Sequence, residues 1–157
     1  MTVQEITPCV DTDALLAGAQ FADAFRVETG DRNLDARHAG ERMLANQPRW
    51  VDALLSLRNF VVSPLGLKTS GAGAPAPKGM IGIFPVLSET PDRLIAGFND
   101  RHLDFRVVID VTAPEGVGQV TLTTLVKTHN WFGRTYLTII MPFHRLIAPT
   151  LLRQVAG

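Results

Sequence analysis

Acidic, basic and imidazole side chains gather in a short part of the sequence, where they could transfer protons or bind an anion. They are Glu89, Asp100, His102, Asp104 and Arg106. Three of them alternate with apolar residues, which would place an imidazole, a carboxylate and a guanidinium on one face of a strand. The solvated face of an antiparallel sheet predicts the same pattern, with charge pairs worth only about 0.2–1 kcal/mol. We favour the solvated face, because the other face of this strand is uniformly apolar.

Arg58 is a second candidate, because it lies at the edge of an apolar helical stripe. From there it could point into the mouth of a cavity and hold a ligand carboxylate. A half-buried arginine usually has an acidic partner. A structural ion pair with Glu89 or with an aspartate is therefore the preferred interpretation.

The histidines offer a base but no metal site. Neither HxH nor HExxH occurs among the histidines at positions 38, 102, 129 and 144, and the chain has a single cysteine. These spacings predict no metal and no cofactor. His144 follows Pro142 by two residues, so we expect its ring to bond a carbonyl that the proline leaves free. The rival role for His144 is that of a general base in a cavity.

The composition is that of a folded protein without net charge. Of 157 residues, 46% are hydrophobic and 19% are charged, with 15 basic and 15 acidic side chains. This balance excludes a disordered chain. Nucleic-acid binding is not expected, because it requires a basic surplus or a basic stripe. Neither a signal peptide nor an apolar run of about 18 residues is present, so we expect a cytoplasmic protein that does not insert into membranes.

The first half is expected to be mainly helical. A short helix at 13–19 precedes a first strand over 21–27. A helix capped by Asn33 or Asp35 should run to Gln47, and a second helix should cover 49–62. The Gly-, Ala- and Pro-rich segment 66–79 has nothing to bury and is expected to form a flexible loop. One face of the first strand carries Phe21, Asp23, Phe25 and Val27.

After the loop, the hydrophobic period changes from helical to alternating. Strands are expected within 80–87, 94–98, 102–111 and 119–129, with a turn at 113–118. On the strand over 102–111 we expect Asp104 and Asp110 to be exposed. We expect the opposite face to be buried as a unit, consisting of Leu103, Phe105, Val107, Ile109 and Val111.

The last segment, 131–155, repeats apolar residues at helical steps and predicts a long C-terminal helix. Pro142 and Pro149 should kink or split it, because each lacks an amide donor. Ile140 and Phe143 are expected to face the sheet, where they would either fill the core or roof a cavity.

Together these elements predict one α+β domain over residues 1–157, in which two short helices and a long C-terminal helix pack on a curved antiparallel sheet. This two-layer order resembles the helix-grip fold of START-like, polyketide-cyclase-like and birch-pollen-allergen-like proteins. The resemblance implies an apolar cavity between the sheet and the last helix. The sequence departs from that plan in its strands, of which about five are predicted where seven are usual.

Four blocks of sequence also resemble a bacterial family of uncharacterised domains that occur alone or fused behind an NAD-binding epimerase-like domain. That resemblance implies no particular activity. The blocks are PRWVDALLSLRN, IGIFPVLSETPD, DRHLDFRV, and HN followed by PFHRLIAPTLLR.

Three functions remain open on this basis. The first is a binder of a small apolar ligand held between the sheet and the C-terminal helix. The second is an enzyme of the cyclase, dehydratase or isomerase kind on the same scaffold. The third is an interaction module that packs against an NAD-binding partner or, as a homodimer, against itself. The residues expected at a ligand site are Arg58, Glu89, Tyr136, Ile140, Phe143 and His144.

Overall fold

The computed structural model describes residues 3–8, 10–31, 33–45, 80–81, 84–99 and 103–156. Its strands form one antiparallel sheet in the order β1-β2-β7-β6-β5-β4-β3. The strands are β1 (Gln4–Ile6), β2 (Phe21–Thr29), β3 (Met80–Ile81), β4 (Phe84–Glu89), β5 (Arg93–Asn99), β6 (Leu103–Thr112) and β7 (Gly118–Thr128). The described α-helices are α1 (Thr12–Leu15), α2 (Ala36–Ala45) and α4 (Trp131–Ala156).

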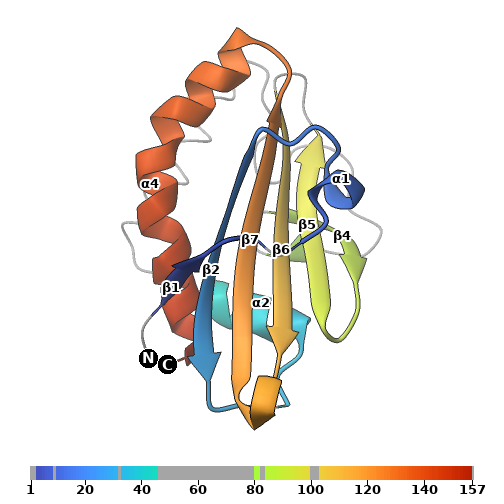
Figure 1. Cartoon of the computed structure of the whole chain (residues 1–157), viewed down its shortest axis with the longest axis vertical. Helices are drawn as coiled ribbons and strands as arrows, with labels where there is room; N and C mark the ends of the chain where they lie inside the picture. Colours follow the sequence, from blue (N-terminus) through green and yellow to red (C-terminus); the bar gives the residue numbers. More distant parts are fainter. Residues whose placement is uncertain are drawn as a thin grey trace.

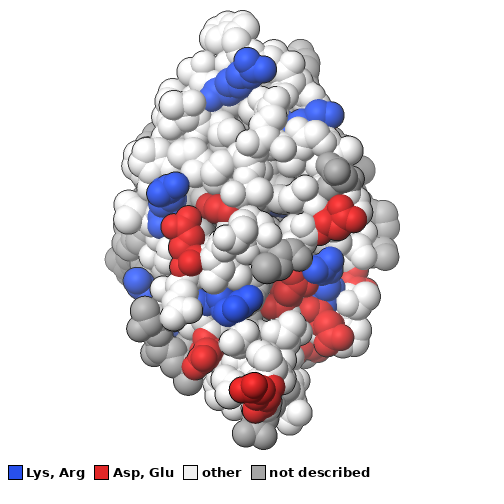
Figure 2. Space-filling view, viewed as in Figure 1, with Lys and Arg blue, Asp and Glu red and all other residues white. Residues whose placement is uncertain are grey.

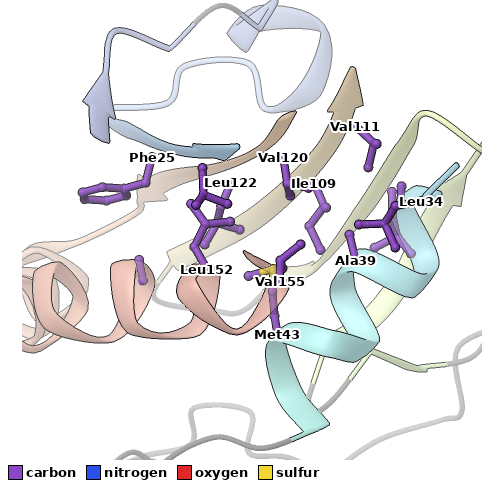
Figure 3. Packing of buried hydrophobic residues seen from close by; sticks show 14 of the residues in the cluster. Phe25, Leu34, Ala39, Met43, Ile109, Val111, Val120, Leu122, Leu152 and Val155 are labelled. Atoms are coloured by element: carbon purple, nitrogen blue, oxygen red, sulfur yellow. The ribbon is translucent and has the colours of Figure 1, made fainter. Parts of the chain in front are cut away.

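The sheet has an inner side, which the two longer helices cover, and an outer side. Both α2 and α4 lie on the inner side, and the core side chains fill the space between these helices and the sheet (Figure 3). On the outer side, the segment that joins β1 to α1 crosses in front of β7 and β6 (Figure 1). The expected α+β fold, an antiparallel sheet with a C-terminal helix, is therefore confirmed.

The core forms because alternate residues of the central strands meet the helices. In register, Phe25 of β2 lies beside Leu122 of β7, which lies beside Ile109 of β6. All three side chains are buried, and Leu152 of α4 is buried against the same cluster. Burial of such side chains is worth roughly 1.5–3 kcal/mol each, so this layer fixes how α4 lies on the sheet.

The strand prediction was right in position and short in number. Each of the four longest strands contains or closely matches a predicted run. The predicted run 80–87 holds two strands, β3 and most of β4, and β1 was not predicted. A strand of three residues or of two residues is too short to show alternation. The predicted helix at 49–62 and the predicted loop at 66–79 lie outside the described residues.

The C-terminal helix is not split at its two prolines, which was one of the two outcomes that the sequence predicted. It runs from Trp131 to Ala156 with Pro142 and Pro149 inside it. Asn130 caps its start, since Asn130 Oδ1 accepts a hydrogen bond from the backbone N–H of Gly133 at 2.9 Å. A proline removes one helical hydrogen bond, and packing of the helix on a sheet can offset that loss.

Candidate functional site

The inner side of the sheet contains a buried carboxylate that is hydrogen-bonded to an imidazole. His144 Nε2 lies 3.1 Å from Asp23 Oδ2 and 3.3 Å from Asp23 Oδ1. The Asp23 side chain is 8% exposed and that of His144 is 20% exposed. The ring of Phe21 meets the imidazole edge-on, with 6.2 Å between ring centroids. An ionisable pair is thus enclosed at the junction of β2 and α4.

The alternation of β2 places Asp23 in this position. Its neighbours two residues away, Phe21 and Phe25, share its face of the strand. Its cross-strand partner is Thr124 of β7, which is also buried. Helix α4 runs along the same side of the sheet and brings His144 from 121 residues further along the chain. Two polar side chains therefore meet within an otherwise largely apolar layer.

This arrangement gives the imidazole a defined role. An ionised carboxylate can only accept hydrogen bonds, so Nε2 carries the proton whenever the ring is neutral. The remaining nitrogen, Nδ1, then presents a lone pair. Histidines held in this way serve as bases or as hydrogen-bond acceptors in many binding and catalytic sites.

The structure corrects the expected role of His144. Its ring bonds Asp23 rather than a carbonyl left free by Pro142. The ring lies against β2, and a carboxylate is a stronger partner than a neutral carbonyl. The sequence therefore singled out His144 without its partner, and a role for His144 in ligand binding stays a prediction.

Phe143 does not close the core as predicted, since it is 40% exposed. Successive residues on a helix point about 100° apart, so Phe143 cannot share the direction of His144, which is turned toward β2. Further along α4, the positions that do close the core are Ala148, Leu152 and Val155. Tyr136 and Ile140 belong to α4 by their backbone, but their side chains lie outside the described part of the structure, as does Arg58.

Glu89 lies apart from His144, in a structural contact. It stands at the end of β4, four places away from β2 in the sheet order. Arg37 of α2 donates through Nε to Glu89 Oε1 at 2.9 Å. That hydrogen bond, offset in part by desolvation, raises the pKa of the Arg37 guanidinium. Glu89 thus helps to fix the start of α2 on the β4–β5 hairpin.

The polar face of β6 is less exposed than the sequence predicts. Side-chain exposure is 14% for Asp104 and 18% for Asp110. Val108, which lies between them on that face, is fully buried. The one-sided sheet prediction did not anticipate this burial.

The predicted apolar face of β6 does point toward the helices, but only part of it is buried. Leu103, Ile109 and Val111 are buried, while Phe105 and Val107 are only half-buried. The prediction of a buried face is therefore confirmed at the Val111 end of the strand. Near the middle of the strand, two residues are less buried than predicted.

A second aspartate–histidine pair lies on this outer side. His129 Nε2 is 3.0 Å from Asp104 Oδ1. The two groups do not have the geometry of a hydrogen bond, and the buried Oδ1 atom of Asp104 accepts no hydrogen bond from the described residues. Arg106 is half-buried nearby, and its desolvation lowers the pKa of the guanidinium, partly offset by Asp104. Asp100 and His102, the other members of the predicted cluster, lie outside the described residues.

Charges on the visible outer face are mixed rather than of one sign. Figure 2 shows acidic and basic groups side by side over its lower half, and an upper half that is largely uncharged. Arg93 of β5 and Asp110 of β6 form an ion pair, with 3.2 Å between Nη2 and Oδ2. This hydrogen bonding raises the pKa of Arg93 despite partial burial.

The described residues contain no group of three or more His, Cys, Asp and Glu side chains arranged to hold a metal ion. None of the helices in those ranges is long and apolar enough to cross a membrane.

Asp23 is the functional candidate that sequence reasoning missed. Its signal was nevertheless present, since the alternation of 21–27 places this acid on the same face as Phe21, Phe25 and Val27. A charged residue on a core-facing strand surface requires a partner. Only the tertiary structure shows that the partner comes from the C-terminal helix.

Comparison with known proteins gives a family and a distant structural likeness. The profile of the family described as "Protein of unknown function (DUF2867)" matches residues 15–151. A crystal structure of a conserved protein from Geobacillus kaustophilus is 14% identical, with a TM-score of 0.39 over 87% of this chain and 93% of that chain. No curated protein matches the chain.

Proposed function

The chain belongs to the DUF2867 family of proteins of unknown function, and we propose from the geometry of its own site that it binds a small ligand between the sheet and α4. The observation that carries this proposal is the enclosed pair of Asp23 and His144. A ligand site in a protein is mostly apolar, with a few polar groups that fix the orientation of the ligand. The inner layer around this pair has that composition.

The surroundings of the pair support an apolar ligand. Phe21 packs edge-on against the imidazole. Phe25 and Leu122, which follow on the same side of the sheet, are buried hydrophobic residues. A partly exposed imidazole beside such a layer offers a ligand both apolar contact and one polar anchor. Of the residues expected from the sequence, His144 takes the anchoring role in this proposal.

The proposal is tested with a neutral apolar dye, N-phenyl-1-naphthylamine, and with native mass spectrometry of the purified protein. We expect dye fluorescence to rise on binding, or a small molecule to co-purify and to be displaced by the dye. His144→Ala should change the dye affinity, because it alters the site. Leu146→Ala is the matched control, because Leu146 lies on the same helix and is 61% exposed.

Absence of dye binding together with absence of a co-purified molecule would overturn the proposal. In that case the interaction-module hypothesis would become the stronger one. Trp131, Ile139 and Leu146 of α4 are exposed, and such a patch is what that hypothesis requires.

A second candidate function is supported by the same pair. A carboxylate that holds an imidazole is a common arrangement for a general base, as an enzyme of the dehydratase, isomerase or cyclase kind would need. Its test is exchange with solvent deuterium at a carbon next to a carbonyl, measured by NMR on cyclohexanone. Exchange catalysed by wild type and lost in His144→Gln would support the enzyme, and equal exchange in both proteins would exclude it for this probe.

A further inference from the structure

The hydrogen bond between His144 and Asp23 restricts what the site can recognise. Both short contacts to the carboxylate involve the same ring nitrogen, Nε2. While Asp23 is ionised it has no proton to give, so Nε2 must be the donor. The tautomer of the neutral imidazole is thereby fixed, and Nδ1 is left as an acceptor.

Nδ1 of His144 is available to a ligand. Among the described residues, the ring has Asp23 as its hydrogen-bonding partner and Phe21 as its aromatic neighbour. Nδ1 is bonded to neither. The side chain is 20% exposed, so a ligand that donates a hydrogen bond to Nδ1 would take the place of water there.

The same pair disfavours an anionic ligand. Asp23 carries its charge about 3 Å from the imidazole and is 8% exposed, so water screens it weakly. A ligand carboxylate at Nδ1 would face the lone pair of the ring and the negative charge behind it. The less favoured interpretation of Arg58 in the sequence was a contact with a ligand carboxylate, whereas the geometry at His144 favours an uncharged hydrogen-bond donor.

We infer that the ligand is an uncharged apolar molecule that carries one hydrogen-bond donor, such as a hydroxyl group, directed at His144 Nδ1. This inference rests on the proposed function, because it concerns the ligand of that same site. It specifies the chemical class of the ligand, which the fold alone does not specify.

The test compares two probes that differ in a single donor. They are 2-naphthol and 2-methoxynaphthalene, which share the ring system and differ by O–H against O–CH₃. Isothermal titration calorimetry at neutral pH should give wild type an affinity for 2-naphthol about five to ten times higher, the usual effect of one hydrogen bond. In the nitrogen-15 NMR spectrum of the histidine rings, His144 Nδ1 should shift when 2-naphthol is added.

Variants at the two aspartate–histidine pairs locate the effect. His144→Phe keeps a flat ring and removes the acceptor, so the two probes should bind with equal affinity. His129→Phe makes the same change at the outer pair and should leave the preference intact. Because His144→Phe leaves Asp23 without its partner, the double variant Asp23→Asn with His144→Phe provides a second protein without the buried charge.

The outcomes separate this inference from the proposal beneath it. Equal affinities in wild type, or tighter binding of 2-methoxynaphthalene, would overturn the hydroxyl preference and leave ligand binding standing. A preference that survives in either variant lacking His144 would also overturn it. Failure of both naphthalene probes and of the neutral dye to bind would overturn the proposed function itself.

Discussion

Two aspartate–histidine pairs lie on opposite sides of the same sheet and differ in both burial and bonding. Asp23 and His144 on the inner side are 8% and 20% exposed, and the imidazole donates a hydrogen bond to the carboxylate. Asp104 and His129 on the outer side are 14% and 34% exposed, and their contact lacks hydrogen-bond geometry. The same two residue types thus form two contacts that differ in burial and in hydrogen bonding.

The difference follows from the elements that supply each pair. The outer pair joins β6 to the residue just after its neighbour β7, so strand pairing alone brings the two side chains together. The inner pair joins β2 to α4 and exists only when the helix packs on the sheet. A contact across two layers is enclosed by both of them, whereas a contact within one layer keeps a side open to water. The buried contact is accordingly the better candidate for a site.

The largest expected effect on the free energy of unfolding comes from comparing a buried leucine and an exposed leucine of α4. Leu152 is fully buried against the sheet, and Leu146 is 61% exposed. Leu152→Ala should lower the free energy of unfolding by about 3–4 kcal/mol, because it removes core contacts and leaves a cavity. Leu146→Ala should stay within about 0.5 kcal/mol of wild type. Urea denaturation followed by circular dichroism measures both, and similar losses would contradict the assignment of the two helix sides.

The next effect compares the histidines of the two pairs directly. His144→Ala leaves the Asp23 carboxylate buried without a partner, which should cost about 2–3 kcal/mol. His129→Ala should cost less than about 1 kcal/mol, because its contact is more exposed and poorly aligned. The same denaturation experiment gives both values. A larger loss at His129 would mean that the outer pair is the principal one.

The smallest effect uses a third aspartate–histidine pair, which is exposed. Asp35 caps α2, because Asp35 Oδ1 accepts the backbone N–H of His38 at 2.7 Å and also meets the His38 ring. Asp35→Ala should lower stability by about 1 kcal/mol through loss of the cap. His38→Ala should be nearly neutral, since its side chain is 66% exposed.

The Asp35 effect should also depend on pH. The backbone hydrogen bond to His38 lowers the pKa of Asp35 in the folded protein. The stabilisation is therefore fully present above the unfolded pKa of about 4 and is lost as pH falls through the lower folded value. The stability gap between wild type and Asp35→Ala should be constant from pH 7 to about pH 5 and narrow below about pH 4. A gap that does not change down to pH 2 would contradict the capping role.

Much of the fold could be predicted from local patterns, and the site could be predicted only in part. The alternation in β6 and β7 and the helical spacing of α4 depend on nearby residues, so the sequence shows them directly. Asp104 and Asp110 are largely shielded from water although local alternation predicted exposure, because burial depends on what packs over a face and not on alternation alone. His144 was identified by its place near Pro142, whereas its bond to Asp23 depends on how α4 packs. Contacts between residues far apart in the sequence cannot be predicted from the hydrophobic period of a single sequence.

The separation of Asp23 and His144 along the chain also bears on how the protein folds. Strand β2 pairs with β7, and the side chains of Arg26 and Thr121 in that pair are 95 residues apart. The two residues of the site are 121 apart. Closing so long a loop costs conformational entropy before any contact stabilises it, and domains rich in distant contacts fold slowly. During synthesis on the ribosome, β2 would remain without a strand neighbour on its β7 side until β7 had emerged. The proposed ligand site also requires α4, so it would form later still, and binding of a ligand would report that α4 has packed on the sheet.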